Sequence, residues 1–450
     1  MKFGGTSVGS AQAIRNAGSI VQNRLDQNPV VVVSAVSGVT NKLIEIGKSA
    51  SESDNFSKSS SISELRTRHN EIMDELGIKK SIINDELNEL EGVLARIQDD
   101  GLSKANLDHL QSFGERMSSK IFAEYLRTLG INSRQLISYN IGFVSDDNFT
   151  NAELKVCTYD NLQNCAMLRT PGVVNVVTGF IAKTINGEIT TIGRGGSDTT
   201  AAVIGAAIGA KEVQIWTDVN GILTTDPRIV DSARTIREIS FSEAAELAYF
   251  GAKVIHPKTI TPLVERRIPV RVLNTHNPEH EGTTIFKDSK PDGTYKAISM
   301  KKGKSLLRVE SSRMLGAYGF LARIFSIFEN HRTSVDLISS SEVSISITLD
   351  SEEHINEISD ELREIGTVEI MHNRAIICIV GKGMRHTPGV AAEIMSIFSN
   401  EGINIEMISQ GASEINVGVV VKDVDAEHAV RALHRELIEN KEGVNDRNKS

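Results

Sequence analysis

The pattern of hydrophobic and polar positions divides the chain into two parts. In the first part, short continuous runs of apolar residues alternate with longer stretches in which apolar residues recur every three to four positions. Examples of the runs are 30–33 and 172–181. Such runs are typical of parallel strands covered on both faces, and the stretches between them predict helices. The order of strand, helix and strand predicts a three-layer α/β/α fold with a mainly parallel sheet.

The first part of the chain also contains two well-marked helical stretches and one polar loop. Helices are expected over about 11–24 and 106–129, because apolar residues form one stripe along each. Glu115 lies off the stripe of the second helix, so periodicity alone predicts a solvated charge there. The polar segment 49–61 predicts a surface loop, and 62–99 predicts two charged helices.

The second part of the chain repeats itself. GFLARIFSIF at 319–328 aligns with GVAAEIMSIF at 389–398, and SVDLIS at 334–339 aligns with NIEMIS at 404–409. Each copy reads as strand, helix, strand, strand, helix, strand, which predicts two ferredoxin-like (βαββαβ) modules. The expected divisions are a first domain at 1–285, a linker at 286–304, modules at 305–375 and 376–440, and a polar tail at 441–450.

The stretch TTIGRGGSDTTAA, residues 190–202, predicts the end of a strand, a glycine-rich turn and the start of a helix. Its glycines are Gly193, Gly195 and Gly196. Glycine allows close approach of a ligand to the backbone, and a helix N-terminus presents amides to an anion. Arg194 adds a cation and Asp198 a carboxylate that could meet an ammonium group or a metal. Helix capping by Ser197 or Asp198 explains these two residues equally well.

Two further segments carry polar groups at places where α/β enzymes bind ligands. MKFGGTSVGS at 1–10 predicts a very short strand with Lys2 on it, followed by a second glycine turn. TDVNGILTTDPR at 217–228 follows an apolar run, which places its polar residues at the carboxyl edge of the sheet. A plain Asn-Gly turn remains the alternative for the second segment.

Composition narrows the class of protein. The formal net charge of −9 argues against a general nucleic-acid binder. The three cysteines show no CxxC spacing, which argues against a disulfide framework or a zinc site and favours a reducing, cytoplasmic location. No apolar run reaches the ~18 residues of a membrane helix, and no signal-peptide pattern opens the sequence. An anionic substrate would therefore need local cations, for which Lys2, Arg194, Arg228 and Lys253 are candidates.

Six motifs in order resemble the aspartate kinase family over essentially the whole chain. They are KFGGTSVGS, SAVSGVTN, SFGERMSS, TTIGRGGSDTTAA, WTDVNGILTTDPR and FGAKVIHPKTI. The paired modules resemble the ACT domains of that family. The resemblance implies an amino acid kinase fold and ATP-dependent, Mg²⁺-assisted phosphorylation of L-aspartate to 4-phospho-L-aspartate. That reaction is the first step of lysine, threonine and methionine biosynthesis. It also implies a homodimer or homotetramer formed through the ACT domains.

The same resemblance implies the residues of the site. A carboxylate is already a nucleophile, so the site needs cations and amides rather than a general base. The implied roles are these: catalytic, Lys2 and Asp198; substrate-binding, Ser34, Thr40, Glu115, Arg194, Gly195, Gly196 and Ser197; ATP-binding, Lys2, Gly4, Gly5, Thr217, Asp218, Arg228 and Lys253. For Glu115 the resemblance replaces the solvated charge predicted by periodicity with contact to the substrate ammonium or to Lys2.

The first ACT module resembles lysine-inhibited members of the family. The implied effector residues are Met314, Phe320, Leu321, Asp336 and Glu342. Lysine is the favoured feedback effector and threonine the alternative. Because Glu342 recurs in the second copy as Glu414, a structural role in the module is a second interpretation of that residue.

The sequence departs from the family pattern at two positions, and it is consistent with two other functions. Leu223 stands where many relatives have a tyrosine beside the nucleotide, and Met1 directly precedes Lys2 where relatives have a longer first strand. One alternative is a kinase of the same fold that acts on glutamate, acetylglutamate or a nucleotide. The other is a catalytically silent amino-acid sensor. The sequence does not fix the oligomeric state or the metal.

Overall fold

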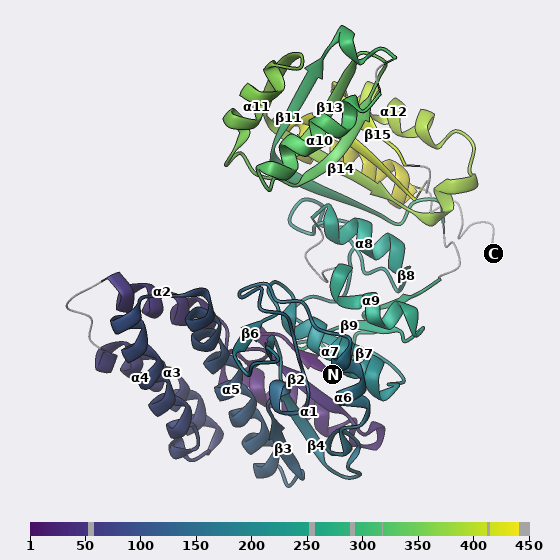
Figure 1. Ribbon diagram of the computed structural model, residues 1–450. Helices are drawn as coiled ribbons and strands as arrows, with labels where there is room; N and C mark the ends of the chain where they lie inside the picture. Colours follow the sequence, from purple (N-terminus) through teal and green to yellow (C-terminus); the bar gives the residue numbers. More distant parts are fainter. Residues whose placement is uncertain (53–57, 252–256, 289–292, 317, 412–414, 441–450) are drawn as a thin grey trace, which may run out of the picture. The chain divides into compact units, whose positions relative to one another are not determined.

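The computed structural model describes residues 1–52, 58–251, 257–288, 293–316, 318–411 and 415–440. The chain divides into two compact units (Figure 1). Unit 1 consists of Met1–Ile222, Arg237–Phe241 and Val254–Ser289, and unit 2 consists of Leu223–Ile236, Ser242–Lys253 and Lys290–Ser450. Each unit has its own sheet and its own core, and each is described separately.

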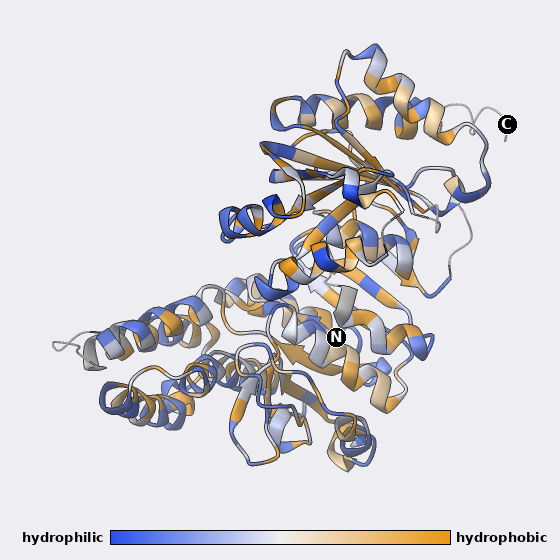
Figure 2. Cartoon of the chain, turned by 45° about the horizontal axis from the view of Figure 1, so that its top comes forward, coloured by the Kyte–Doolittle hydropathy of each residue, from blue (hydrophilic) through white to orange (hydrophobic). Residues whose placement is uncertain are grey.

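Unit 1 is built on an eight-stranded sheet in the order β3-β4-β2-β1-β7-β9-β10-β8. Its strands are β1 (Lys2–Phe3), β2 (Val30–Val33), β3 (Ser133–Leu136), β4 (Val174–Thr178), β7 (Val213–Thr217), β8 (Glu238–Ser240), β9 (Val270–Asn274) and β10 (Thr283–Phe286). All neighbours are parallel except β9 and β10. The strands are predominantly hydrophobic, as expected for a sheet covered on both faces (Figure 2). The predicted mainly parallel sheet is confirmed.

Helices cover the sheet of unit 1 in two groups. The helix α5 (Lys104–Thr128) packs on β2, β3 and β4 together with α1 (Ala11–Gln22). The helix α7 (Gly196–Ile208) packs on β1, β2 and β7 and contacts α6 (Cys157–Gln163) and α9 (Pro257–Glu265). These groups and the sheet form the three predicted layers.

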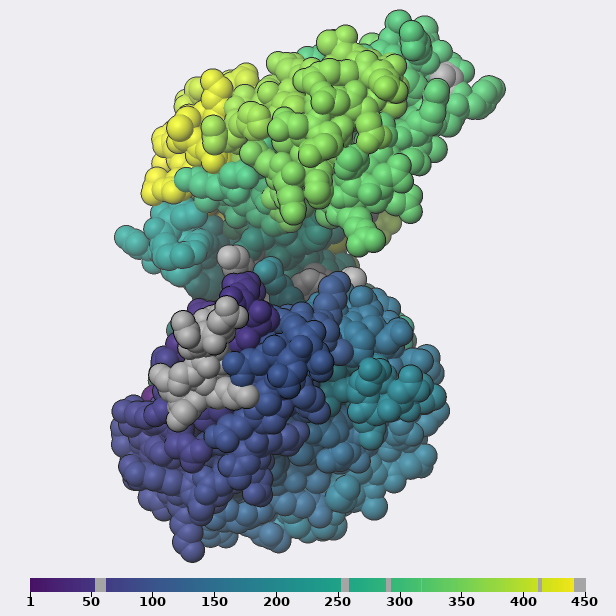
Figure 3. Space-filling view, turned by 60° about the vertical axis from the view of Figure 1, so that its left-hand side comes forward, coloured from purple at the N-terminus to yellow at the C-terminus, as the bar shows by residue number. Residues whose placement is uncertain are grey.

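A helical group lies beside α5. It consists of α2 (Val39–Glu52), α3 (Lys58–Leu76) and α4 (Asn84–Asp100), and with α5 it forms a continuous blue and purple surface in the space-filling view (Figure 3). The loop predicted over 49–61 is wrong at both ends, because 49–52 belong to α2 and 58–61 to α3. Ala50 and Ile62 are buried, so packing of these flanking residues extends the helices into a serine-rich segment.

Several short elements complete the molecule. A two-stranded hairpin is formed by β5 (Ile181–Lys183) and β6 (Ile189–Thr191). The 3₁₀ helices are Thr6–Val8, Leu25–Gln27, Lys80–Ile83, Ser138–Asn140, Ala166–Arg169, Ser312–Met314 and Lys382–His386, and a π-helix spans Arg435–Glu439. None of the helices in the described ranges combines the length and apolar character that crossing a membrane requires.

Unit 2 contains a six-stranded antiparallel sheet in the order β12-β13-β11-β14-β16-β15. Its strands are β11 (Ala297–Glu310), β12 (Val335–Ser340), β13 (Ser344–Leu349), β14 (Thr367–Val380), β15 (Met407–Ser409) and β16 (Asn416–Lys422). Its helices are α8 (Phe241–Tyr249, whose first residue belongs to unit 1), α10 (Phe320–Asn330), α11 (Ile355–Arg363), α12 (Val390–Asn400) and α13 (Asp423–His434). Two strands of 14 residues, β11 and β14, run through both repeats.

The second module differs from the predicted order in one strand. Its last strand does not follow α13, where the chain continues into the π-helix. Instead the first half of β11 pairs with the end of β14, from Ala297 opposite Val380 to Lys301 opposite Ile376. Residues 297–304, expected to be linker, therefore belong to a strand. In the sequence this strand comes before the first module, and the other elements of the second module come after it. The first module is therefore inserted into the second, which an alignment of the two copies could not reveal.

The strand β1 is short in comparison with its neighbours. Lys2 pairs with Val32 on one side and Ile215 on the other, so both neighbouring strands extend beyond β1 at its amino end. A cavity of about 700 Å³ opens there, lined in part by Met1, Val30 and Val213. The Met1 amino group donates a hydrogen bond of 2.7 Å to the Val30 carbonyl, and burial lowers its pKa to about 5.

Two valines added before Met1 should stabilise unit 1, because they would extend β1 between β2 and β7 and occupy the cavity. We expect a gain of about 2 kcal/mol in the free energy of unfolding. The gain should increase as the pH falls from about 8 to about 5, because over that range the unfolded parent takes up a proton on its terminal amine and the folded parent does not. Chemical denaturation at several pH values measures both effects. Two added glycines are the control, and equal gains from both extensions would contradict the strand-extension explanation.

Candidate active site

An ion pair joins the strand β1 to the amino end of α7. Nζ of Lys2 lies 2.6 Å from Oδ1 of Asp198, and the two side chains are only 12% and 16% exposed. The carboxyl ends of parallel strands lie at one edge of the sheet. The N-terminus of a helix at this edge carries a partial positive charge. The ion pair brings together the two residues, Lys2 and Asp198, for which the family resemblance implies a catalytic role.

The glycine-rich turn explains why these residues can meet. Gly193 and Gly195 have φ values of +77° and +75°, in the left-handed region that favours glycine. Gly195 is the N-cap of α7, and no side chain caps the helix. Ser197 and Asp198 therefore lie within its first turn, and the capping interpretation of these two residues is wrong. Instead of accepting from the helix amides, the Asp198 carboxylate pairs with Lys2.

The loop between β2 and α2 forms the neighbouring wall. Ser34 donates its backbone N–H to the Phe3 carbonyl at 3.1 Å, and Ala35 donates its N–H to Oε1 of Glu115 at 3.1 Å. Thr40 stands half-buried at the start of α2. These contacts hold the predicted substrate loop against β1 and α5.

Glu115 is buried, with 3% of its surface exposed. The solvated charge predicted by periodicity is therefore wrong, because α5 is covered by the sheet on one side and by α2 and α4 on another. Burial raises the pKa of Glu115 to about 8, and the Ala35 N–H opposes that rise. Its Oε2 has no hydrogen-bond partner among the described residues. A buried acceptor without a partner is suited to a cationic ligand.

The predicted nucleotide residues are divided between the units. In unit 1, Gly4 donates its N–H to the Trp216 carbonyl at 3.3 Å, and Oγ1 of Thr217 donates to Oδ1 of Asp218 at 3.2 Å. Arg228 belongs to unit 2 and forms an ion pair of 2.6 Å with Asp226. Lys253 lies outside the described residues. The ATP-binding roles of all these residues stay predictions.

Sequence reasoning missed residues that support the site. A Cβ at Gly179, just after β4, would lie 2.5 Å from Oγ of Ser197, so only glycine fits there. Thr200 accepts a hydrogen bond of 3.1 Å from the N–H of Phe180, a non-glycine residue with φ +68°. Asp108 binds Thr191 at the end of β6. These contacts join residues that are distant in the chain, so the pattern along any one segment does not reveal them.

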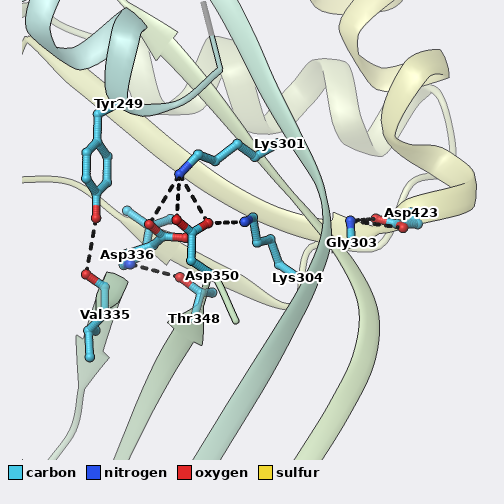
Figure 4. Close-up of polar contacts among 10 residues, drawn as sticks. Tyr249, Lys301, Gly303, Lys304, Val335, Asp336, Thr348, Asp350 and Asp423 are labelled. Carbon is cyan, nitrogen blue, oxygen red and sulfur yellow. Dashed lines mark hydrogen bonds and ion pairs between the residues drawn. The ribbon is translucent and has the colours of Figure 1, made fainter. Parts of the chain in front are cut away.

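The predicted effector residues lie in the first ACT module, but their side chains differ in exposure and do not line one open pocket. The Asp336 side chain on β12 is 1% exposed and lies 3.4 Å from Nζ of Lys301 (Figure 4). Phe320 is buried in the module core, Met314 is half-buried, and Leu321 is 41% exposed. Glu342 lies exposed at the turn between β12 and β13. Its counterpart in the second copy, Glu414, lies outside the described residues.

A small ionic cluster surrounds Asp336. Lys301 also lies 3.3 Å from Asp350, which accepts a second ion pair from Lys304 (Figure 4). The ammonium of Lys301 lies 4.7 Å from the ring centroid of Tyr249, and the Tyr249 hydroxyl donates to the Val335 carbonyl at 3.2 Å. Burial raises the pKa of Asp336, and Lys301 opposes that rise. Asp336 is thus a carboxylate that already holds an ammonium group.

Comparison with known proteins gives matches along nearly the whole chain. Residues 1–274 match the amino acid kinase family, and residues 377–437 match an ACT domain. The chain is 40% identical to aspartokinase 1, chloroplastic, of Arabidopsis thaliana, over 98% of this chain and 80% of that protein.

Two solved structures of Escherichia coli aspartokinase III are similar to this one. The complex with aspartate and ADP (R-state) has a TM-score of 0.82 at 34% identity, and the complex with lysine and aspartate (T-state) has a TM-score of 0.80 at 35% identity. Both comparisons cover 97% of this chain and 98% of the other.

Replacing Glu115 with Gln should change the pH dependence of stability. In the parent, folding raises the pKa of Glu115 from about 4.5 to about 8. The folded protein therefore keeps a proton that the unfolded chain loses, and the stability of the parent falls as the pH rises over this range. Glutamine has no proton to lose and can still accept from the Ala35 N–H. We expect the variant to gain on the order of 2–4 kcal/mol relative to the parent between pH 5 and pH 8 in urea unfolding. Glu153→Gln, at an exposed position, is the control. A difference that does not change with pH would contradict the raised pKa.

Proposed function

The chain belongs to the amino acid kinase family, as an aspartokinase with an ACT region, and we propose that it phosphorylates L-aspartate with ATP as the first step of lysine, threonine and methionine biosynthesis. A side-chain carboxylate oxygen of aspartate attacks the γ-phosphorus as the bond to the β–γ bridging oxygen breaks. The products are 4-phospho-L-aspartate and ADP. The observation that carries the proposal is the Lys2–Asp198 ion pair where β1 meets α7.

Each part of the site has a task in this reaction. Lys2 neutralises the transferring phosphoryl group, and Gly4 and Gly5 lie beside the phosphates, where the Gly4 N–H would first have to leave the Trp216 carbonyl. Arg194 binds the α-carboxylate of aspartate in the geometry that guanidinium favours. Arg194 is exposed and forms no ion pair with any carboxylate in the described ranges, so it is available for a ligand. The substrate ammonium then meets Glu115 and Asp198, and its positive charge would favour loss of the Glu115 proton.

Magnesium would be held mainly by the phosphates of ATP. No cluster of three or more histidine, cysteine, aspartate or glutamate side chains suited to a metal occurs in the described residues. Mg²⁺ commonly binds through one or two carboxylates, several waters and substrate phosphates, which fits this residue set. When bound, the ion would neutralise charge on the phosphates.

Feedback inhibition is the second part of the proposal. Lysine is the favoured effector and threonine the alternative, with Asp336 in the first ACT module as the carboxylate that receives the effector ammonium. The support is that Asp336 already lies 3.4 Å from the ammonium of Lys301. Because Asp336 is almost fully buried, an effector must displace Lys301 or move β12 to reach it.

Assembly through the ACT modules is also proposed, as a homodimer or homotetramer. The support is a set of large apolar side chains on this part of unit 2 that are more than 40% exposed: Leu321, Ile338, Val343 and Ile408. Apolar side chains of this kind are typical of interfaces between subunits.

The activity is tested by trapping acyl phosphate with hydroxylamine in the presence of ATP and L-aspartate. Hydroxamate formed from aspartate, but not from glutamate or acetylglutamate, is the expected result. A folded protein that binds lysine or threonine and forms no hydroxamate would instead be a sensor.

Lys2→Ala and Arg194→Ala should separate chemistry from substrate binding. We expect Lys2→Ala to lower kcat ~100-fold or more, because charge stabilisation is lost in the transition state. Arg194→Ala should instead raise the KM for aspartate ~10–100-fold, because charge-assisted hydrogen bonds to the substrate are lost. Lys155→Ala, at an exposed lysine, is the control. The opposite pattern in steady-state kinetics would mean that the two roles are exchanged.

Asp336→Asn should weaken inhibition by the effector. A neutral amide attracts an ammonium group less than a carboxylate does, so the concentration for half-inhibition by lysine should rise ~10-fold or more. The measurement is the ratio of inhibited to uninhibited rate over a lysine titration, repeated with threonine. Asp360→Asn, on the exposed face of α11, is the control. An unchanged titration curve would remove Asp336 from the effector site.

A further inference from the structure

Asp108 lies on α5 and is fully buried. Its Oδ2 accepts hydrogen bonds from the N–H of Thr150 at 2.8 Å and from the N–H of Thr191 at 2.9 Å. Its Oδ1 accepts from Oγ1 of Thr191 at 2.8 Å. One side chain thus joins α5 to two segments that lie more than forty positions away in the chain.

Thr191 is the last residue of β6, immediately before the glycine-rich turn. Its N–H is bound by Asp108, and its carbonyl accepts from the N–H of Ala152 at 2.9 Å. Both backbone groups of Thr191 are therefore fixed from outside the hairpin. Arg194 follows three residues later, after Gly193 in the left-handed conformation.

Thr150 belongs to a loop that packs over the same turn. It has φ +75°, which is costly for a residue with a branched side chain, and the bond from its N–H to Asp108 helps to stabilise that conformation. The next residue, Asn151, places its Oδ1 only 2.5 Å from the position that a Cβ on Gly193 would occupy. Asp108 therefore holds the turn from one side through Thr191 and from the other through this loop.

The same helix also holds the loop after β2. Glu115 lies seven residues after Asp108, which is about two helical turns or about 10 Å along the same face. Glu115 binds Ala35 in the loop that carries Ser34 and precedes Thr40. One rigid helix therefore contacts both the turn with Arg194 and the loop with Ser34.

We propose that Asp108 is a positioning residue for the substrate pocket, which fixes the distance between Arg194 and the loop after β2. It acts through Thr191 and Thr150 and does not touch the substrate itself. The inference rests on the proposed function, in which Arg194 binds the α-carboxylate of aspartate. Loss of the Asp108 contacts should loosen the turn and weaken aspartate binding, with little effect on the ATP site or on the chemical step.

Kinetics of the full chain test this inference. Asp108→Ala removes all three acceptor contacts, and we expect the KM for aspartate to rise ~10-fold or more while kcat and the KM for ATP stay within ~3-fold. Asp108→Asn should restore a near-parental KM, because its amide oxygen can accept from both N–H groups while its NH₂ donates to the Thr191 hydroxyl. Asp147→Ala, at an exposed position in the neighbouring loop, is the control and should leave all constants unchanged.

Thr191→Val supplies the second test. Alone it removes one donor, and a rise of ~3-fold in the KM for aspartate is expected. Combined with Asp108→Asn it leaves the amide NH₂ without an acceptor, while the amide oxygen still accepts from both N–H groups, so the KM for aspartate of the double variant should exceed that of either single variant and stay below that of Asp108→Ala. If Asp108→Ala fails to fold, Thr191→Val and the double variant carry the test.

Two results would overturn the inference. One is a lower melting temperature in these variants with an unchanged KM for aspartate, since that would show a purely structural role. The other is a fall in kcat with the KM for aspartate unchanged. Failure of the proposed function is distinct, because the parent protein would then form no acyl phosphate from aspartate.

Discussion

The Lys2–Asp198 ion pair depends on the positions of the elements that carry it. Lys2 is on a strand of two residues, and Asp198 is in the first turn of a helix that begins only after two glycines have reversed the backbone. The pair forms because β1 is held between β2 and β7, and because α7 packs on the same strands. The two charges are little exposed, so solvent screens them weakly and their attraction is stronger than that of a surface pair.

In unit 2, the helix α8 is tied to both ACT modules. Glu243 accepts a hydrogen bond of 2.8 Å from the N–H of Lys382 in the second module, and Tyr249 donates to Val335 in the first. The chain enters α8 directly from β8, a strand of the sheet in unit 1. The chain from β8 through α8 and the hydrogen bond from Tyr249 to Val335 therefore link β8 to the strand that carries Asp336.

Prediction from the sequence failed where a contact reached across the chain. Glu115 was placed in solvent by the apolar stripe of its helix, yet its partner Ala35 is 80 positions away. Asp108 had no sequence signal at all, because its partner Thr191 is 83 positions away. The second module was given a last strand of its own, whereas β11 supplies that strand from before the first module. Family resemblance supplied Glu115 as a site residue, but it did not supply Asp108 or the strand.

The sequence by itself determined the local structure and the chemistry of the motifs. Apolar runs gave the buried strands, the long amphipathic stretch gave α5, and the glycines of 193–196 gave a turn that only small residues can form. These are properties of neighbouring residues, which steric preference and side-chain periodicity fix. The tertiary structure alone decided that Lys2 meets Asp198, that Glu115 is buried and that Asp108 holds the turn. Packing of distant segments sets such contacts, and periodicity along one segment contains no information about what packs against it.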